Sequence, residues 1–404
     1  MPSKSNYRRF RNQSVEAQEG DGSDLEKLIE SRKLTTLLID SGKRENVHVS
    51  LHFGAGLADR LVSENKKLTW VGNGSSTIVI NLKKYNIQAE CPEVDVETFV
   101  TMDTSSLVVT MKLENYEEVM EKVIRAVFLE ELSQEEFEKE RDRIIDVYDH
   151  NLQQVEYAAK TEIQMHAMPN RLFSPQLVRD DLRQMEFSDV IHLNQTLFQQ
   201  NNVKLVVCGD LSHAGIKEWF EKNDHLLEDA PAHDVDRVNR QPHEFMDRHL
   251  VYQQAKDSYE IGTILFRKKK SGQSMAEEEL FLRVIGEVVF QDHFFVQVAP
   301  DQSSIIYVGN QYVNYKNRIR TTVWNQKKFD EAKEKIRDQF NQIIEYDPKK
   351  FSVIFGQYAI KQIHLPDLLY ETQADNFPQF IDYIRNVKEK MVETKLSYLK
   401  GEKP

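Results

Sequence analysis

Apolar residues recur along the chain first with the two-residue spacing of strands and then with the spacing of helices, and this order occurs twice. In the first half, strand patterns cover residues 33–40, 47–53, 94–102, 106–113 and 202–210, and helical patterns cover 114–132, 133–168, 188–198 and 213–223. We expect 47–53 to return beside 33–40 as a hairpin, 57–67 to be a weak helix or loop, and 77–87 to be a short element of ambiguous period. Ser188 is the expected N-cap of its helix.

The second half repeats this order. Residues 250–267, 303–308 and 319–324 have strand patterns, and 275–298, 325–338, 349–363 and 377–396 have helical ones. This half is expected to end on a helix and a charged tail, without a counterpart of the 202–210 strand. The predicted class is α+β, with two tandem homologous α/β-sandwich halves. The predicted organisation is a disordered tail (1–30), a first half (31–225), a polar linker (226–247) and a second half (248–400).

One amphipathic helix occurs twice without a gap. Ser133 and Asn325 are its two N-caps, and Phe137 and Phe329 occupy the same position, an offset of 192 residues (329 − 137). The identical pairs are Gln134/Gln326, Phe137/Phe329, Ile144/Ile336 and Asp146/Asp338, and charge sign is kept at Glu138/Asp330, Arg141/Lys333, Asp142/Glu334 and Arg143/Lys335. Agreement in cap, apolar stripe and charge favours a duplicated unit over a chance likeness of two charged helices.

Composition narrows the class of protein. The 404 residues carry a net charge of −12, which argues against nucleic acid as the main partner. Cys91 and Cys208 suit neither a disulfide framework nor a metal cluster, so a reducing, cytoplasmic compartment is expected. Residues 1–14 are basic but lack the apolar core of a secretory signal, and a disordered tail is favoured over a transit peptide.

Three motifs and the duplication resemble one family. The motifs are the opening hairpin followed by Phe53-Gly54-Ala55-Gly56, the helix Phe137-x-x-Glu140-Arg141-Asp142-x-Ile144-Ile145, and the strand Leu205-Val206-Val207-Cys208-Gly209-Asp210-Leu211. Together they resemble the pitrilysin/insulinase family of metallopeptidases, the inverzincins. The resemblance implies two homologous α+β halves that pair within and between subunits to enclose a peptide chamber.

The resemblance also shows what the chain lacks. Active members hold zinc with His-x-x-Glu-His on a helix, and neither this motif nor His-Glu-x-x-His occurs anywhere. The interval 56–86, where the family keeps the motif, contains no histidine. The third ligand would lie seven residues after Glu140, which is Val147, and Asp146 is turned about 100° away on a helix.

A second family feature is incomplete. Active partners present an arginine and a tyrosine to the substrate. Tyr307 matches the tyrosine and is the one candidate substrate-binding residue, but the preceding residues 297–302 include no arginine. Plain strand packing explains Tyr307 equally well.

Other candidate constellations favour structural interpretations. His48 and His52 lie four apart on a predicted strand, about 13 Å, too far to share one zinc. Residues 72–76 contain Asn-Gly and no suitably placed lysine, so a turn is favoured over a phosphate loop. A metal site near the linker, built from His233, His243 and His249 with Glu244 and Asp247, has no recognisable spacing pattern. The basic run Arg267-Lys268-Lys269-Lys270 suits a solvated loop, or weak contact with an acidic partner or a membrane surface.

The sequence therefore predicts a non-catalytic member of this family. It would pair with an active zinc peptidase subunit, or with itself, to process or bind a peptide, possibilities that include a bacteriocin precursor. No catalytic residue, metal ligand or cofactor is expected in this chain, with zinc only in the partner. Two alternatives stay open: a zinc metallopeptidase with a relocated site using His150, His166 or the linker histidines, and a pure scaffold protein.

Overall fold

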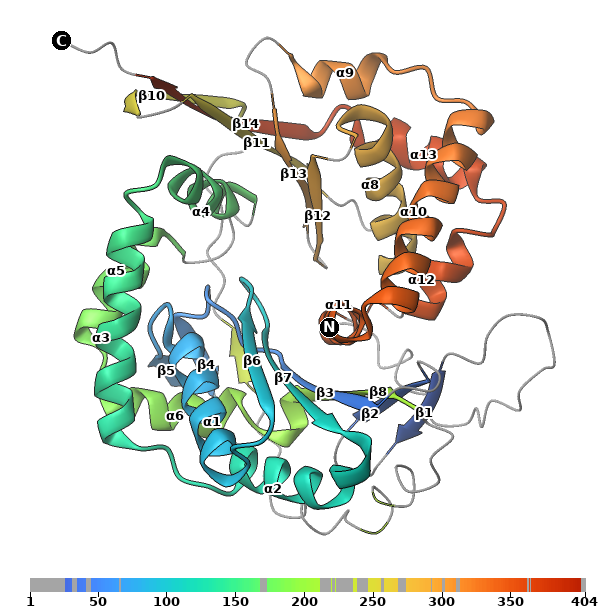
Figure 1. The fold of residues 1–404 in the computed structure, drawn as a ribbon. Helices are drawn as coiled ribbons and strands as arrows, with labels where there is room; N and C mark the ends of the chain where they lie inside the picture. Colours follow the sequence, from blue (N-terminus) through green and yellow to red (C-terminus); the bar gives the residue numbers. More distant parts are fainter. Residues whose placement is uncertain are drawn as a thin grey trace.

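The computed structural model describes residues 26–30, 35–40, 45–64, 67–167, 173–210, 219, 222, 235–237, 246–255, 258–267, 274–291, 293–299, 302–309, 313–361, 363 and 365–400. Two sheets with their helices lie one above the other (Figure 1). The predicted α+β class with two repeated halves is confirmed.

The first sheet has six strands in the order β1-β2-β8-β3-β7-β6. Their bounds are β1 Glu26–Glu30, β2 Thr35–Asp40, β3 Asn46–Phe53, β6 Asp95–Val100, β7 Ser105–Lys112 and β8 Val203–Gly209. Alternate residues of β3, from Val47 to Phe53, enter a core shared with helices α1 (Ser75–Glu90) and α2 (Tyr116–Phe128). The expected pairing of residues 94–102 with 106–113 is confirmed by the antiparallel β6–β7 ladder.

The predicted opening hairpin is wrong in its pairing. β2 and β3 do not bond to each other, because β8 lies between them, parallel to β2 and antiparallel to β3. The apolar run of β8 is buried on both faces, and this central position explains it. The last residues of the predicted tail, Glu26–Glu30, form β1 at the sheet edge.

The second sheet has the order β10-β14-β11-β13-β12. Its strands are β10 Arg248–Ala255, β11 Tyr259–Arg267, β12 Phe294–Val298, β13 Gln302–Val308 and β14 Met391–Lys400. β14 is parallel to β10 and antiparallel to β11, as β8 is to β2 and β3. The second half therefore does contain a counterpart of the 202–210 strand, and the predicted terminal helix over 377–396 is wrong beyond α13 (Phe377–Val387).

Three other element predictions are wrong in part. Residues 319–324 are not a strand, because Asn314 caps the helix α9 (Tyr315–Thr321), which buries Ile319. The helix predicted over 275–298 ends as α8 (Met275–Val289), after which Gln291 adopts a positive φ and β12 follows. Residues 57–67 lead into a hairpin of β4 (Leu61–Glu64) and β5 (Lys67–Trp70) rather than a helix.

The remaining helices are α3 Gln134–Asn151, α4 Val155–Ala167, α5 Pro175–Gln184, α6 Phe187–Leu197, α10 Gln326–Tyr346, α11 Pro348–Ile360 and α12 Leu365–Glu371. Among them, α6, α10 and α11 confirm the helices predicted over 188–198, 325–338 and 349–363, whereas α5 and α12 were not predicted. The N-cap of α6 is Glu186, which forms a capping box with Asp189, rather than Ser188. Of residues 213–223, only Trp219 and Lys222 are described, both helical, so that helix prediction is otherwise outside the described residues.

The repeated helices α3 and α10 have the predicted caps and buried stripes. The Ser133 hydroxyl accepts a hydrogen bond from the backbone N–H of Glu136, and the Asn325 side chain accepts one from Lys328. Phe137 and Phe329 are both buried, at 2% and 0% exposure. The duplication inferred from the pattern is therefore present in the fold.

One helix of each half packs on the sheet of the other half. The single helix predicted over 133–168 is broken after Asn151, and α4 then packs on β11, β13 and β14 of the second sheet. The equivalent α11 packs on β3 and β8 of the first sheet, and Figure 1 shows both helices between the sheets. Ion pairs fix both ends of α11: Lys349 with Asp95 and Glu97, and Lys361 with Asp103.

A buried histidine lies under α11. His52 is fully buried; its Nε2 lies 2.8 Å from Ser50 Oγ and its Nδ1 2.8 Å from Ser106 Oγ. Ser50 Oγ donates to the Ser352 carbonyl of α11 at 3.5 Å. Gly356 of α11 lies against the imidazole, where a Cβ would come within 1.9 Å of Cδ2. The two halves therefore meet directly on this ring.

Acid is expected to weaken the fold through His52. Burial lowers the pKa of His52 to about 3, against a small opposing effect of the Ser352 carbonyl, so the folded state excludes a proton that the unfolded chain binds below about pH 6.5. The contribution is thus complete above about pH 6.5 and falls by up to ~1.4 kcal/mol per pH unit as the pH drops toward 3. Urea unfolding at several pH values checks this; a His52→Asn variant should have a flatter profile, and an equal slope in both proteins would contradict it.

The predicted linker is partly incorporated into the first half. Within 226–247, β9 (Val235–Arg237) pairs antiparallel with β4. Met246 and Asp247 are also described, whereas His233, His243 and Glu244 lie outside the described residues.

Candidate functional site

The interval where the resembled family keeps its zinc motif folds into β4, β5 and α1. α1 packs on α3, on α2 and on the edge strand β6. Asn81 and Tyr85 are four residues apart on α1 and therefore share one helix face, which is directed at Glu140 of α3.

Glu140 is the centre of a closed hydrogen-bond network. Its carboxylate is 1% exposed and accepts bonds from Asn81 Nδ2 (2.6 Å), Tyr85 Oη (2.6 Å), Arg143 Nε (2.7 Å) and an Arg143 terminal nitrogen (2.6 Å). Thr98 of β6 donates to Asn81 Oδ1 at 2.7 Å, so the network reaches the sheet edge. Burial alone would raise the pKa of Glu140, but the bonds from Arg143, Tyr85 and Asn81 outweigh it and lower that pKa.

These residues do not fit a zinc ion. Zinc takes nitrogen, sulfur or carboxylate ligands, and among the network side chains only Glu140 is one. Both of its oxygens are already engaged by hydrogen-bond donors. No group of three or more His, Cys, Asp or Glu suited to a metal is found within the described ranges.

An aliphatic residue occupies the position that corresponds to the third metal ligand of the resembled family. Val147 lies two turns after Glu140 on α3 and is 42% exposed, and the neighbouring Asp146 is also exposed. An aliphatic side chain cannot bind a metal here. The absence of metal ligands from this chain stays a prediction.

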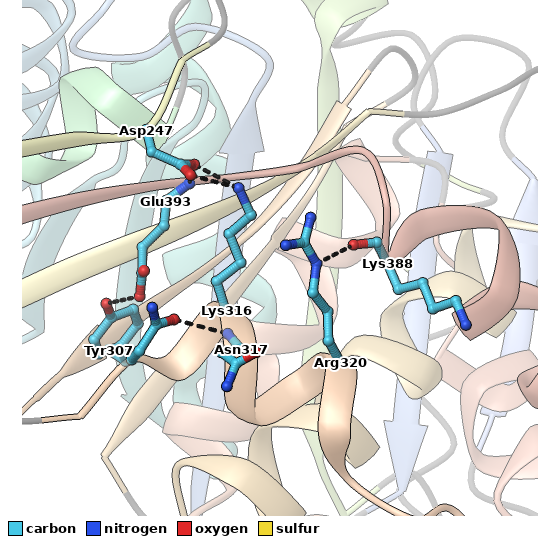
Figure 2. Close-up of polar contacts among 8 residues, drawn as sticks. Asp247, Tyr307, Lys316, Asn317, Arg320, Lys388 and Glu393 are labelled. Atoms are coloured by element: carbon cyan, nitrogen blue, oxygen red, sulfur yellow. Dashed lines mark hydrogen bonds and ion pairs between the residues drawn. The ribbon is translucent and has the colours of Figure 1, made fainter.

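Tyr307 lies in the core of the second half. It is 1% exposed, its ring lies 4.8 Å from Phe290 and 4.5 Å from Tyr315, and it covers Gly262. Its hydroxyl donates to Glu393 at 2.6 Å, as Figure 2 shows. Burial, together with Glu393 and Glu260, raises the pKa of Tyr307 far above its ordinary value. This packing accounts for the side chain, and its substrate role stays a prediction.

Near Tyr307, hydrogen bonds and an ion pair join Asp247, the last residue of the predicted linker, to the second half. Asp247 accepts two bonds from Lys316 (2.7 and 2.6 Å) and one from the backbone N–H of Glu393 (2.9 Å). Figure 2 shows these contacts beside the bond from Arg320 to the Lys388 carbonyl. Asp247, named above as a possible metal ligand, is thus part of a structural ion pair.

Replacing Tyr307 with phenylalanine is expected to cost about 1.5–3 kcal/mol, because the Glu393 carboxylate loses its donor in a buried setting. Chemical denaturation measures this loss. Peptide retention by the folded variant should be unchanged if the role of Tyr307 is packing. Loss of retention without loss of stability would instead support the substrate role.

The other candidate histidines are separate. His48 Nδ1 lies 3.0 Å from Thr110 Oγ1 on the first sheet, away from the His52 network. His150 is exposed at the end of α3, and His166 is half-buried on α4, where its Nε2 has no hydrogen-bond partner within the described ranges. Residues 72–74 form the predicted turn before α1, and of the run 267–270 only Arg267, the last residue of β11, is described.

The edge strand β6 offers a surface for an extended peptide. In the described part of the chain, β6 pairs only with β7 and ends the first sheet. Phe99 is 39% exposed, on the face opposite Thr98, which bonds to α1. An unpaired strand edge can bind a peptide through backbone hydrogen bonds, and alternate side chains then add selectivity.

The fold is that of M16-like peptidases, the pitrilysin/insulinase architecture that the motifs indicated. A putative M16-like peptidase from Alicyclobacillus acidocaldarius matches with a TM-score of 0.76 at 12% identity, over 93% of this chain and 98% of its own. A peptidase M16 inactive domain from Pseudomonas fluorescens matches with a TM-score of 0.68 at 12% identity, over 94% and 99%.

The periplasmic protease PqqL from Escherichia coli shows how such a unit is used in a longer chain. Its first half matches with a TM-score of 0.66 at 11% identity, over 92% of both chains. Within the whole of PqqL, this chain covers 48% of the length. No family model and no curated protein matches the sequence. No helix in the described part of the chain has the length and apolar character needed to cross a bilayer.

Proposed function

We propose that this chain is a catalytically inactive M16-like subunit that binds an extended peptide and acts beside a homologous zinc-containing subunit. The observation that carries the proposal is Glu140. Its buried carboxylate is engaged by Asn81, Tyr85 and Arg143, against the interval 56–86 that contains no histidine. The solved inactive M16 domain, matched over nearly the whole chain, supports the same conclusion.

The scaffold around the Glu140 network supports a role in peptide binding. The free edge of β6 is joined to the Glu140 network through Thr98 and Asn81. A subunit with this edge can still hold a peptide while a partner supplies the zinc and performs the cleavage. A bacteriocin precursor is one such peptide, and the proposed location is the cytoplasm, because the two cysteines of the chain, Cys91 and Cys208, are buried, lie far apart in the sequence and suit a reducing compartment.

The test is purification of the chain alone and with a homologue that contains His-x-x-Glu-His. We expect far less than one zinc per chain and no peptide cleavage by the chain alone, with cleavage appearing in the pair. About one zinc per chain together with cleavage by the lone protein would overturn the proposal and favour the relocated-site alternative. Hydrogen exchange should slow in Asp95–Val100 on addition of peptide; no slowing would favour a scaffold that does not bind peptide.

A further inference from the structure

One face of the second sheet carries buried carboxylates near the edge strand β10. Glu260 on β11 pairs with Ser397 on β14, and Val251 on β10 pairs with the same serine from the other side. Cross-strand partners point to the same face, so these three side chains form a row that starts at the sheet edge. Glu260 is 9% exposed and Ser397 3% exposed.

The Glu260 carboxylate is incompletely bonded. Oε2 accepts a bond from Ser397 Oγ at 3.2 Å, and Oε1 is buried and has no hydrogen-bond partner among the residues that the structure describes. No ion pair of Glu260 is found within the described part of the chain. The nearby Lys395 instead donates to the Val313 carbonyl at 2.5 Å and lies over the Tyr315 ring. Burying a carboxylate oxygen without a hydrogen-bond donor costs free energy. A cationic ligand with N–H donors would therefore stabilise this oxygen.

Two residues of the edge strand β10 lie on the outer side of this carboxylate. His249 on β10 is exposed, and its Nε2 lies 2.8 Å from Ser397 Oγ. Since Ser397 donates to Glu260, it accepts from the Nε2–H of His249. Val251, 48% exposed, lies over the same serine. Among the described residues, His249 and Val251 are therefore the side chains of this row that lie between Ser397 and the edge of the sheet.

We propose that Glu260, with Ser397 and His249 at its outer side, is a binding site for an organic cation that carries N–H donors, an ammonium or a guanidinium. A charge-assisted hydrogen bond to Oε1 would satisfy the one oxygen that the fold leaves open. A metal ion fits less well, because no set of three metal-binding side chains occurs among the described residues. The source is a basic side chain of a peptide or a small free amine. This inference does not depend on the proposed peptidase-like function.

The test uses the full chain and three probes: a short peptide with one arginine, the same peptide with citrulline, and free butylguanidinium. Calorimetry should show binding of the arginine peptide, at least about tenfold weaker binding to Glu260→Gln, and no binding of the citrulline peptide. Butylguanidinium binding would identify a free amine as sufficient; binding of the arginine peptide alone would identify a peptide side chain.

Glu393→Gln is the matched control, because it also neutralises a buried carboxylate on β14 and keeps an acceptor for Tyr307. It should bind the probes as the native chain does. Equal loss in both variants would assign the effect to the general negative field and overturn the site. Equal affinity of Glu260→Gln and native protein, or no binding of any probe, would also overturn it. If Glu260→Gln fails to fold, Ser397→Ala, which removes the neighbouring hydroxyl, should change the affinity for the arginine peptide.

Discussion

Glu140→Ala is expected to destabilise the protein by about 3 kcal/mol, measured by urea unfolding, because it breaks a buried, four-fold hydrogen-bonded ion pair. Breaking such pairs costs roughly 3–5 kcal/mol, and the lower value applies because the Arg143 side chain is 54% exposed and can be hydrated. Asn81 and Tyr85 lose their acceptor as well. The consequence is a loosened contact between α1 and α3.

The matched control is Glu138→Ala on the same helix. Glu138 is exposed and, in the described part of the chain, bonds only to Gln134, so its loss should change stability by about 0.5 kcal/mol or less. If Glu140→Ala costs no more than Glu138→Ala, the network does not hold the two helices together.

The repeated helices could be predicted because their signals are local. Ser133 and Asn325 cap them, and Phe137 and Phe329 mark the buried stripe within a few residues. The central strand β14 could not be recognised, because its neighbours are set by tertiary pairing with β10 and β11. Helix α1 was ambiguous for a related reason: it buries Asn81 and Lys83, which removes the apolar period.

From the sequence, the candidate site could be predicted only as a place where the zinc ligands of the resembled family are absent. The absence of histidine from residues 56–86 and the valine at 147 follow from the sequence directly. The network around Glu140 joins Asn81 to Glu140, 59 residues apart, and no spacing rule indicates that pair. The four-residue spacing of Asn81 and Tyr85 is a usable signal only once α1 is known to be a helix.

The contact between the two halves is expected to fail when Gly356 is changed to alanine. The new Cβ would lie 1.9 Å from His52 Cδ2 and 2.1 Å from Nε2, and the imidazole is held by Ser50 and Ser106. Overpacking costs about 1–3 kcal/mol and a lost hydrogen bond about 1 kcal/mol, whereas alanine gains only about 1 kcal/mol in helix propensity. We expect a net loss of about 2 kcal/mol in the free energy of unfolding.

A double-mutant cycle isolates this contact. In a His52→Ala background the obstructing ring is gone, so Gly356→Ala should be neutral or stabilising by up to about 1 kcal/mol. Gln357→Ala, one residue along α11 and partly exposed, controls for changes in the helix itself. An equal cost of Gly356→Ala in both backgrounds would mean that His52 is not what limits the approach of α11. If the cost does depend on His52, the imidazole ring of His52 limits how closely α11 of the second half can pack on the first sheet. Gly356 allows that close packing because it has no side chain.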